Sequence, residues 1–466
     1  MSNDLEHKRD ISVARCCKGL TMPKLYPKKW SIGFLGEIMD YKRSFYNHAG
    51  RINENQVLMF NLVSSAVAKL DLACYERFEK GQWTQEEAGA FVQNGFLVPT
   101  ETNELGKVKA LRYVNNYSTD NAAFQILPTT ACNARCPYCY EQDFVSQSFP
   151  ESLEPKLVEF ISSYMGIAKH IHVTWFGGEP LLRPDFIERI SETLIEKAKQ
   201  REVGYTADII SNGSLVTEDI AHLLKRCHVG NAQISLDGDE SEYGKRKNYV
   251  SGDHTLSSIF DSIDCLLDAG IAVSVRINAD KNNHSSVLRL IHMLGKRFAN
   301  SQLFSAHVAP LYSTLGDKSC FEKEELTEVY KSIFHAMIDS GLITSINGLP
   351  LNFNNASCCA RGLNNFCIGP DGFVSKCDHF LGDKRDLVGT LETGVEFNDA
   401  MDFWANPALP PECEECSYLP SCQAGCYAGL AMGFGYGRCP YIRYTYDAVF
   451  DAVSYMDNLR HNERSE

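Results

Sequence analysis

The sequence lacks the apolar segments that place a chain in or across a membrane. None of its hydrophobic runs approaches the roughly 20 residues that a membrane-spanning helix needs. The N-terminus, MSNDLEHKRDISVARCC, has no apolar core of the secretory type. We therefore expect a cytoplasmic protein with no membrane partner.

The sequence also lacks an excess of positive charge. It has 45 lysine and arginine residues against 59 aspartate and glutamate residues, which gives a formal net charge of −14. Proteins that bind nucleic acid usually carry a basic surface, so this balance argues against a nucleic-acid partner. It suits a small-molecule or peptide substrate better.

Cysteine, in contrast, is abundant, with 18 residues in a chain of 466. Disulfides are not expected in a long chain without a secretion signal. Clustered cysteines in such a chain more often bind metal or carry out redox chemistry. Cys74, Cys227 and Cys265 lie in or beside apolar helical patterns and are interpreted as packing residues.

Three regions follow one another along the chain. Residues 1–120 carry no metal-binding motif, residues 121–345 alternate β-rich runs with amphipathic stretches, and residues 346–466 are rich in cysteine. The strand candidates of the middle region are residues 124–130, 172–176, 207–211, 231–236, 271–278 and 304–310, and residues 184–200 and 217–227 are helix candidates. This alternation predicts an α/β fold with a parallel sheet, a partial (β/α)6 barrel whose ligands collect at the carboxyl ends of the strands.

The first strand candidate is followed by TTACNARCPYCYEQ, in which Cys132, Cys136 and Cys139 are spaced C-x3-C-x2-C. Three thiolates can hold three irons of a [4Fe–4S] cluster and leave the fourth iron open, although a zinc site uses similar ligands. The triplet followed by the aromatic Tyr140 resembles the signature of the radical S-adenosylmethionine (SAM) superfamily. The resemblance implies that the open iron binds SAM, and that one electron cleaves SAM to a 5′-deoxyadenosyl radical that abstracts hydrogen from the substrate.

Further turns resemble the SAM-binding turns of that family. Residues 175–180 read WFGGEP, and the resemblance implies that this turn receives the SAM ammonium group. The third strand candidate ends in a Ser-Asn-Gly turn, which the resemblance places near the ribose. A serine at the end of the fourth candidate and an arginine just beyond it are expected to bind the SAM carboxylate. The implied SAM contacts are Tyr140, Gly177, Gly178, Glu179, Ser211, Asn212, Ser235 and Arg246, with Arg276 as a rival for Arg246.

The cysteine-rich tail resembles the SPASM extension of radical SAM peptide modifiers, which binds two auxiliary [4Fe–4S] clusters. The resemblance implies that Cys359, Cys377 and Cys426 hold auxiliary cluster I, and that Cys413, Cys416, Cys422 and Cys439 hold auxiliary cluster II. The fourth ligand of auxiliary cluster I is Cys367, Cys358 or a substrate thiolate at an open iron. Asp378 follows Cys377 directly, and the corresponding aspartate of sulfatase-maturating relatives takes a proton during substrate oxidation, so it is the catalytic candidate. A zinc ribbon is the alternative interpretation of the tail.

The N-terminal region predicts paired strands over residues 45–65, an amphipathic helix over residues 65–80 and a capped helix that starts at Thr84, with Glu87 completing the capping box. A following wing strand makes the pattern winged-helix-like. It resembles the leader-recognition elements of enzymes that modify ribosomally made peptides, which bind the leader as an added strand.

The combined resemblance implies a radical SAM/SPASM peptide maturase with SAM and three [4Fe–4S] clusters. It would install a cross-link, most readily a thioether, in a precursor peptide, with electrons from a reduced flavodoxin or ferredoxin. An anaerobic sulfatase-maturating enzyme that makes formylglycine is one alternative, and a non-catalytic iron–sulfur electron carrier is another. The substrate peptide and the oligomeric state are not evident from the sequence.

Overall fold

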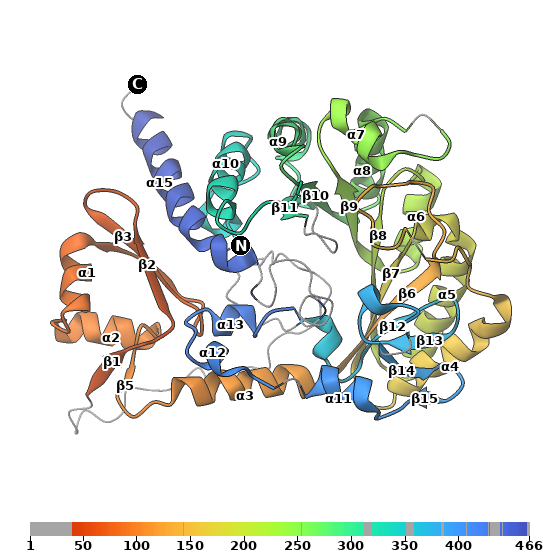
Figure 1. Cartoon of the computed structure of the whole chain (residues 1–466), viewed down its shortest axis with the longest axis horizontal. Helices are drawn as coiled ribbons and strands as arrows, with labels where there is room; N and C mark the ends of the chain where they lie inside the picture. The colour runs from red at the N-terminus through yellow and green to blue at the C-terminus, as the bar shows by residue number, and fades with distance from the viewer. Residues whose placement is uncertain are drawn as a thin grey trace, which may run out of the picture.

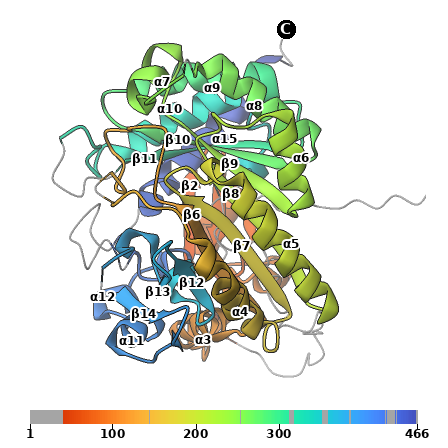
Figure 2. The same ribbon diagram turned by 90° about the vertical axis from the view of Figure 1, so that its right-hand side faces the viewer.

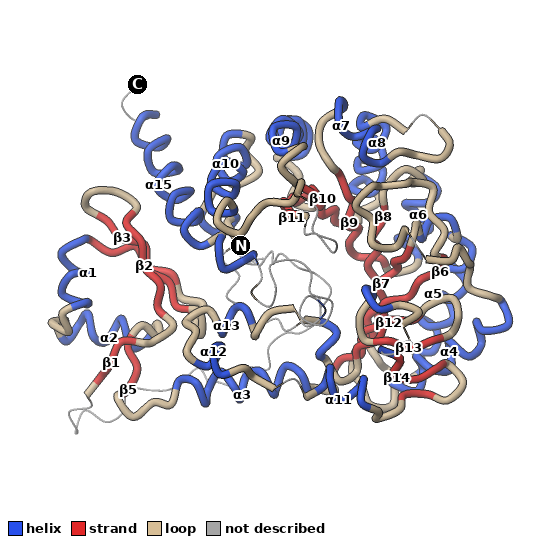
Figure 3. The backbone as a smooth tube through the Cα atoms, viewed as in Figure 1, coloured by secondary structure: helices blue, strands red, loops and turns tan. Residues whose placement is uncertain are grey.

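A ten-stranded sheet organises the molecule, with helices on its outer side (Figures 1 and 3). The computed structural model describes residues 40–142, 144–252, 254–311, 318–350, 358–383, 386–406, 408–426, 428, 439 and 441–463. Six consecutive strands of this sheet are parallel and neighbour one another in chain order: β6 (Asn121–Thr129), β7 (His170–Gly177), β8 (Gly204–Ser211), β9 (Val229–Leu236), β10 (Ala272–Ala279) and β11 (Phe304–Pro310). The predicted parallel α/β sheet is therefore confirmed, and each predicted strand overlaps an observed one.

Helices connect these strands and cover the outer face of the sheet, and Figure 2 shows α4 and α5 lying against β6 and β7. Their buried faces, among them Phe186 and Leu194 of α5, pack against strand residues such as Trp175. The helices are α4 (Glu154–Tyr164), α5 (Pro184–Gln200), α6 (Glu218–Arg226), α7 (Glu240–Lys247), α8 (Leu256–Asp268), α9 (His284–Phe298) and α10 (Leu326–Asp339). The apolar periodicity of residues 184–200 thus predicted α5 within its observed bounds.

The N-terminal elements form two small antiparallel sheets and three helices. The strands β2 (Asn47–Arg51), β3 (Gln56–Asn61) and β4 (Val67–Asp71) pair in that order, and β1 (Tyr41–Arg43) pairs with β5 (Leu97–Pro99). The helices are α1 (Leu72–Glu79), α2 (Gln85–Gln93) and α3 (Glu104–Tyr117). The capping box of Thr84 and Glu87 is present.

The helix predicted over residues 65–80 is wrong in its first half. Residues Val67–Asp71 form β4, because their alternation places Ala68 and Leu70 against the apolar cluster around Phe78, whereas Val67 and Lys69 face away from it. Pairing with β3 decides in favour of the strand, since a two-residue period matches a sheet with one buried face.

The tail folds back onto both other parts of the chain. Its first strand, β12 (Asn365–Ile368), is parallel to β6 and extends the sheet, followed by β13 (Phe373–Ser375), β14 (Leu387–Thr390) and β15 (Gly394–Val395). The tail helices are α11 (Asp399–Ala405), α12 (Pro411–Glu414), α13 (Leu419–Cys422) and α15 (Tyr446–Glu463). Phe450 of α15 covers Gly50 of β2 so closely that a Cβ atom there would lie 2.5 Å from the ring. No helix in the described part of the chain combines the length and the apolar character that crossing a membrane requires.

Candidate active site

The loop after β6 brings Cys132, Cys136 and Cys139 together. Burial raises the pKa of Cys132 and that of Cys139 to about 11, and in both cases the neighbouring Cys136 acts in the same direction. Three buried thiols at this spacing are costly to ionise unless a cation is present. Their donor chemistry therefore fits an iron–sulfur cluster, whose irons stabilise the thiolate form.

Two glycines let the turn after β7 approach this loop. A Cβ atom on Gly178 would lie 2.2 Å from the carbonyl oxygen of Ala131, and one on Gly177, whose φ is +115°, would lie 2.4 Å from that of Thr129. The backbone N–H of Glu179 donates to the Ala131 carbonyl at 2.9 Å. Only glycine fits such contacts, so the Gly-Gly pair fixes the turn directly beside the first cysteine.

The carboxylate of Glu179 joins the turns after β7 and β8. It is fully buried and accepts hydrogen bonds from the Ser211 hydroxyl at 2.8 Å and from the backbone N–H of Asn212 at 2.8 Å. Asn212 in turn donates to the side chain of Asn133 in the cysteine loop at 2.8 Å. The predicted SAM contacts Gly177, Gly178, Glu179, Ser211 and Asn212 are therefore brought together with the cysteines.

A buried lysine, which the sequence analysis missed, completes this group. Lys247 is 2% exposed, pairs with the carboxylate of Asp237 at 3.0 Å and donates to the hydroxyl of Ser235 at 2.9 Å. Burial raises the pKa of Cys132 and of Cys136, and the charge of Lys247 partly opposes this rise. Lys247 thus lies beside the predicted SAM-carboxylate contact Ser235 and close to the cysteines.

Arg246, the residue predicted for that role, points elsewhere. Its guanidinium donates to Asp280 at 2.8 Å and lies over the ring of Tyr138 at 5.3 Å. The rival Arg276 donates to Asn278 at 3.0 Å. Both arginines therefore have partners on or next to β10, whereas Lys247 reaches Ser235.

Asp378 from the tail faces the cysteine loop across the sheet edge. The hydroxyl of Tyr140 donates to its carboxylate at 2.9 Å, and the ring of His379 stacks on that of Tyr140 at 4.2 Å. Burial would raise the pKa of Asp378, but hydrogen bonds from His379, Tyr140 and Cys377 outweigh it and hold this pKa at about 2. The predicted catalytic residue is therefore an anion at neutral pH, and Tyr140 contacts it directly.

A second carboxyl group next to Asp378, that of Glu141, was also missed by the sequence analysis. Burial raises the pKa of Glu141 to about 8, and the charge of Asp378 acts in the same direction. At neutral pH Glu141 is mostly protonated while Asp378 is ionised. Two neighbouring carboxyl groups in opposite protonation states can act as a proton donor and a proton acceptor.

The tail cysteines influence one another in two groups. Burial raises the pKa of Cys422 to about 12, and Cys439, Cys413 and Cys416 act in the same direction. Burial also raises the pKa of Cys377 well above its usual value, with further contributions from Asp378, Cys358 and Cys359.

The packing of a residue close to Cys426 shows which group of cysteines Cys426 lies beside. Ala428, two residues after it, packs in an apolar cluster with Ala360 and Cys377. The segment that carries Cys426 therefore lies against the group of Cys359 and Cys377.

Cys367, a candidate fourth ligand, lies inside β12 and is 1% exposed. Burial raises its pKa, and the next contributions come from the carboxylates of Asp378 and Glu141. Cys358, by contrast, hydrogen-bonds to Cys359. The structure therefore places Cys358 nearer to the auxiliary cluster I group, while Cys367 lies towards the carboxyl pair.

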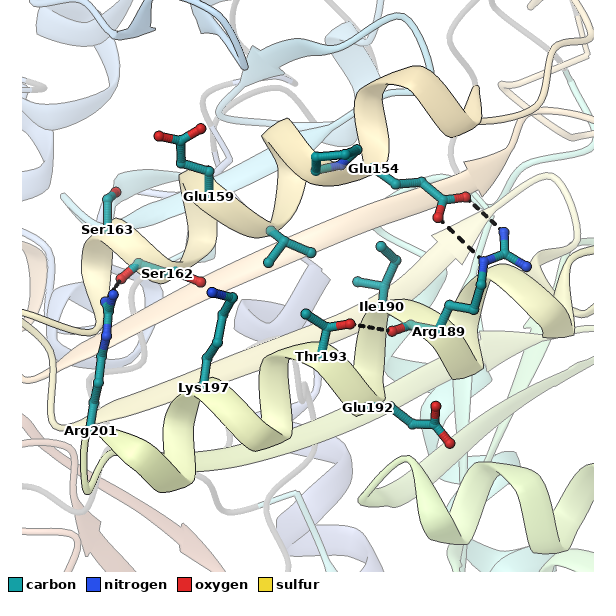
Figure 4. A pocket seen from close by; sticks show the side chains of 12 residues that line it. Glu154, Glu159, Ser162, Ser163, Arg189, Ile190, Glu192, Thr193, Lys197 and Arg201 are labelled. Carbon is teal, nitrogen blue, oxygen red and sulfur yellow. Dashed lines mark hydrogen bonds and ion pairs between the residues drawn. The ribbon is translucent and has the colours of Figure 1, made fainter.

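A surface groove of about 820 Å³ between α4 and α5 lies apart from this site (Figure 4). Its polar side chains largely engage one another or the backbone, as in the bond from Arg189 to Glu154 at 2.7 Å. The groove is on the outer side of the helices, whereas the turns described above lie at the carboxyl ends of the strands. It has no part in the candidate site.

The comparisons with known proteins agree with the fold. Residues 126–294, which span β6 to most of α9, match the Radical SAM superfamily. This part of the chain is therefore a radical SAM domain.

Among its relatives, the serine-type anaerobic sulfatase-maturating enzyme of Klebsiella aerogenes is 25% identical over 320 residues, covering 64% of this chain and 78% of that enzyme. The mycofactocin maturase MftC of Mycobacterium tuberculosis is 23% identical over 321 residues, covering 64% of this chain and 76% of that one. The fold resembles that of native anSMEcpe solved with bound AdoMet and Cp18Cys peptide, with a TM-score of 0.56, 17% identity, and coverage of 73% of this chain and 99% of that one.

Replacing Lys247 tests its place in the site. We expect Lys247→Met to leave the buried Asp237 carboxylate without its ion pair, which costs about 3–5 kcal/mol of stability. Loss of the ammonium beside Ser235 should also weaken SAM binding by about ten-fold or more, the usual value of a hydrogen bond to a charged group. Denaturant unfolding and equilibrium binding of SAM to the anaerobically reconstituted enzyme measure the two effects.

Lys245→Met is the matched control, because Lys245 is on the same helix, is exposed and forms a surface ion pair with Glu242. That change should cost no more than about 1 kcal/mol. Equal behaviour of the two variants would show that Lys247 has no special role.

Proposed function

We propose that this radical SAM enzyme is a maturase that oxidises a residue of a ribosomally made precursor peptide. The observation that carries the proposal is the contact between Asp378 of the cysteine-rich tail and Tyr140 of the cysteine loop. A carboxylate that is anionic at neutral pH thereby lies next to the place where a radical would form. The relatives named as sulfatase-maturating enzymes and as a mycofactocin maturase support a peptide substrate.

Cys132, Cys136 and Cys139 would hold a [4Fe–4S] cluster, which, with SAM and an electron from a reduced flavodoxin or ferredoxin, supplies a 5′-deoxyadenosyl radical. The chain's own residues bind and orient SAM. The glycine turn at Gly177 and Gly178 offers its backbone, while Ser235 and the ammonium of Lys247 suit a carboxylate. We assign Arg246 to the support of this region through Asp280 rather than to SAM itself.

Asp378 would take the proton that the substrate releases after a hydrogen atom has been removed, and the electron that remains would pass to an auxiliary cluster held by the tail cysteines. The hydrogen bonds that Asp378 accepts from Tyr140 and His379 orient the carboxylate and keep it ionised. A base in this position serves both candidate reactions. In thioether formation it takes the proton of a cysteine thiol, and in formylglycine formation that of a serine hydroxyl or a cysteine thiol.

Asp378→Asn separates proton transfer from radical formation. We expect this variant still to cleave SAM, but without oxidising the peptide at the normal rate. Peptide oxidation should fall by about 10²-fold or more, the usual contribution of a general base. His379→Asn should cause a smaller loss, because Asp378 is still present and still accepts a hydrogen bond from Tyr140. Measuring 5′-deoxyadenosine and peptide product side by side decides the matter, and full peptide oxidation by Asp378→Asn would exclude the proposed role.

Thioether formation is our first candidate for the bond made, and formylglycine formation is the second because sulfatase-maturating enzymes are among the relatives. The two products differ chemically. A thioether keeps the peptide sulfur but no longer reacts with a thiol-alkylating reagent, whereas formylglycine carries an aldehyde that forms a hydrazone. Mass spectrometry of the treated peptide therefore distinguishes them.

The tail cysteines would bind two auxiliary [4Fe–4S] clusters. Cys413, Cys416, Cys422 and Cys439 form one ligand set, in agreement with their mutual influence on the pKa of Cys422. Cys359, Cys377 and Cys426 belong to the other. For its fourth ligand we propose Cys358 in place of Cys367, because Cys358 hydrogen-bonds to Cys359 and acts on Cys377.

Two single variants test the choice of fourth ligand. We expect Cys367→Ala to keep about 12 irons per chain, as three [4Fe–4S] clusters require, and Cys358→Ala to lose iron from auxiliary cluster I or to change its spectrum. Iron and sulfide analysis after anaerobic reconstitution gives the answer. Loss of iron in Cys367→Ala with full iron in Cys358→Ala would restore Cys367 as the ligand.

The N-terminal elements would bind the leader of the precursor peptide. In the described part of the chain β4 pairs with β3 alone, so its other edge is open to an added strand. Val67, which is 40% exposed, offers an apolar contact at this edge. Lys69 of the same strand forms an ion pair with Asp457 of α15, so this sheet contacts the tail directly.

Val67→Asp tests this surface without disturbing the clusters. We expect weaker binding of the precursor peptide, because the variant puts a charge where an apolar contact is expected, while SAM cleavage without peptide is unchanged. Glu76→Gln, an exposed change on α1, serves as the control. Unchanged peptide affinity of Val67→Asp in fluorescence anisotropy would exclude β4 as the docking strand.

A further inference from the structure

Cys422 and Cys426 pose a geometric problem. They are four residues apart, and Cys422 is the last residue of α13. If the helix continued, residues four apart would lie on the same face and both thiols would point to one cluster. The proposed ligand sets nevertheless assign Cys422 to auxiliary cluster II and Cys426 to auxiliary cluster I.

The backbone changes from the right-handed helical conformation to the left-handed conformation between Cys422 and Cys426. Gln423, Ala424 and Gly425 have φ values of +53°, +67° and +79°. Left-handed backbone is unusual for residues other than glycine, and a run of three ends the helix and turns the chain away from its axis. This turn re-aims Cys426 relative to Cys422, and the surrounding structure must hold it in place.

Arg361, which lies beside Cys359 of the auxiliary cluster I group, forms hydrogen bonds to this left-handed turn. It is 1% exposed, lies two residues after Cys359, and donates from its two terminal nitrogens to the carbonyl oxygens of Gln423 and Gly425. The second of these carbonyls belongs to the peptide bond that leads into Cys426. A planar guanidinium can hold two carbonyl groups at a fixed spacing, which the single ammonium of a lysine cannot do.

Apolar packing anchors both sides of the turn. Ala424 is buried among Tyr46, Phe60 and Leu419 on the side of auxiliary cluster II. Ala428 packs with Ala360 and Cys377 on the side of auxiliary cluster I. Arg361 therefore lies where the two groups of cysteines meet.

We infer that Arg361 is the positioning residue that directs Cys426 into auxiliary cluster I by holding the left-handed turn Gln423–Gly425. This inference rests on the proposed auxiliary clusters. The positive charge of Arg361 also suits its place, because a [4Fe–4S] cluster with four thiolates is an anion and a buried cation needs a nearby negative charge.

Arg361→Gln tests the inference through iron content. The wild type should bind about 12 irons per chain, and Arg361→Gln about eight, because auxiliary cluster I loses its Cys426 ligand. Arg361→Lys should behave like Arg361→Gln, since one ammonium does not span both carbonyls. Arg201→Gln is the matched control: Arg201 also donates to a backbone carbonyl, that of Ser162, but lies far from the cysteines, and it should keep about 12 irons.

Combining Arg361→Gln with a cysteine variant of either auxiliary cluster identifies the cluster that is lost. With Cys359→Ala, Arg361→Gln should cause no further loss of iron, because auxiliary cluster I is already absent. With Cys413→Ala, it should remove about four more irons. Full iron content in Arg361→Gln would overturn the inference, and so would equal loss of both auxiliary clusters, which would indicate collapse of the tail. A wild type with only about four irons would overturn the proposed auxiliary clusters themselves.

Discussion

The buried carboxylate of Glu179 is the interaction on which the candidate site depends. It accepts hydrogen bonds from Ser211 and from the backbone of Asn212, and Asn212 continues the chain of contacts to Asn133 in the cysteine loop. A fully buried carboxyl group is tolerated only when such donors surround it, and removal of one donor typically costs about 1–3 kcal/mol. One side chain thereby fixes the ends of β7 and β8 relative to the cysteines, and the turns after these strands cannot move independently of them.

The tail completes the site instead of forming a separate unit beside it. β12 pairs with β6 at the edge of the sheet. The residues that follow β13 therefore lie close to the loop after β6, where Tyr140 donates a hydrogen bond to Asp378. The same tail contacts the N-terminal sheet, where His48 of β2 approaches the carbonyl oxygen of Ser417, next to Cys416. The N-terminal sheet, the cysteine-rich tail and the cysteine loop are thus connected through short, direct contacts.

The sequence predicted those features that local patterns determine. Helical periodicity located α5, and the capping residues Thr84 and Glu87 marked the start of α2. It failed where tertiary contacts decide. Residues 67–71 form a strand because β3 is available as a partner, and Lys247 was missed because its burial depends on how α7 packs beside Asp237. The buried Asp237 was the available signal, since a carboxylate at the end of a buried strand requires a counterion. The position of Cys367 also depends on the pairing of β12 with β6, which no local pattern in residues 365–368 predicts.

Transfer of deuterium from the peptide to the cofactor tests the central claim most directly. The substrate to use is a precursor peptide that the enzyme binds, prepared with deuterium at its carbon-bound positions and incubated anaerobically with SAM, dithionite and the reconstituted enzyme. The account predicts 5′-deoxyadenosine that carries deuterium, formed together with an oxidised peptide, as shown by mass spectrometry. Oxidised peptide accompanied only by unlabelled 5′-deoxyadenosine, or no cleavage of SAM at all, would contradict it.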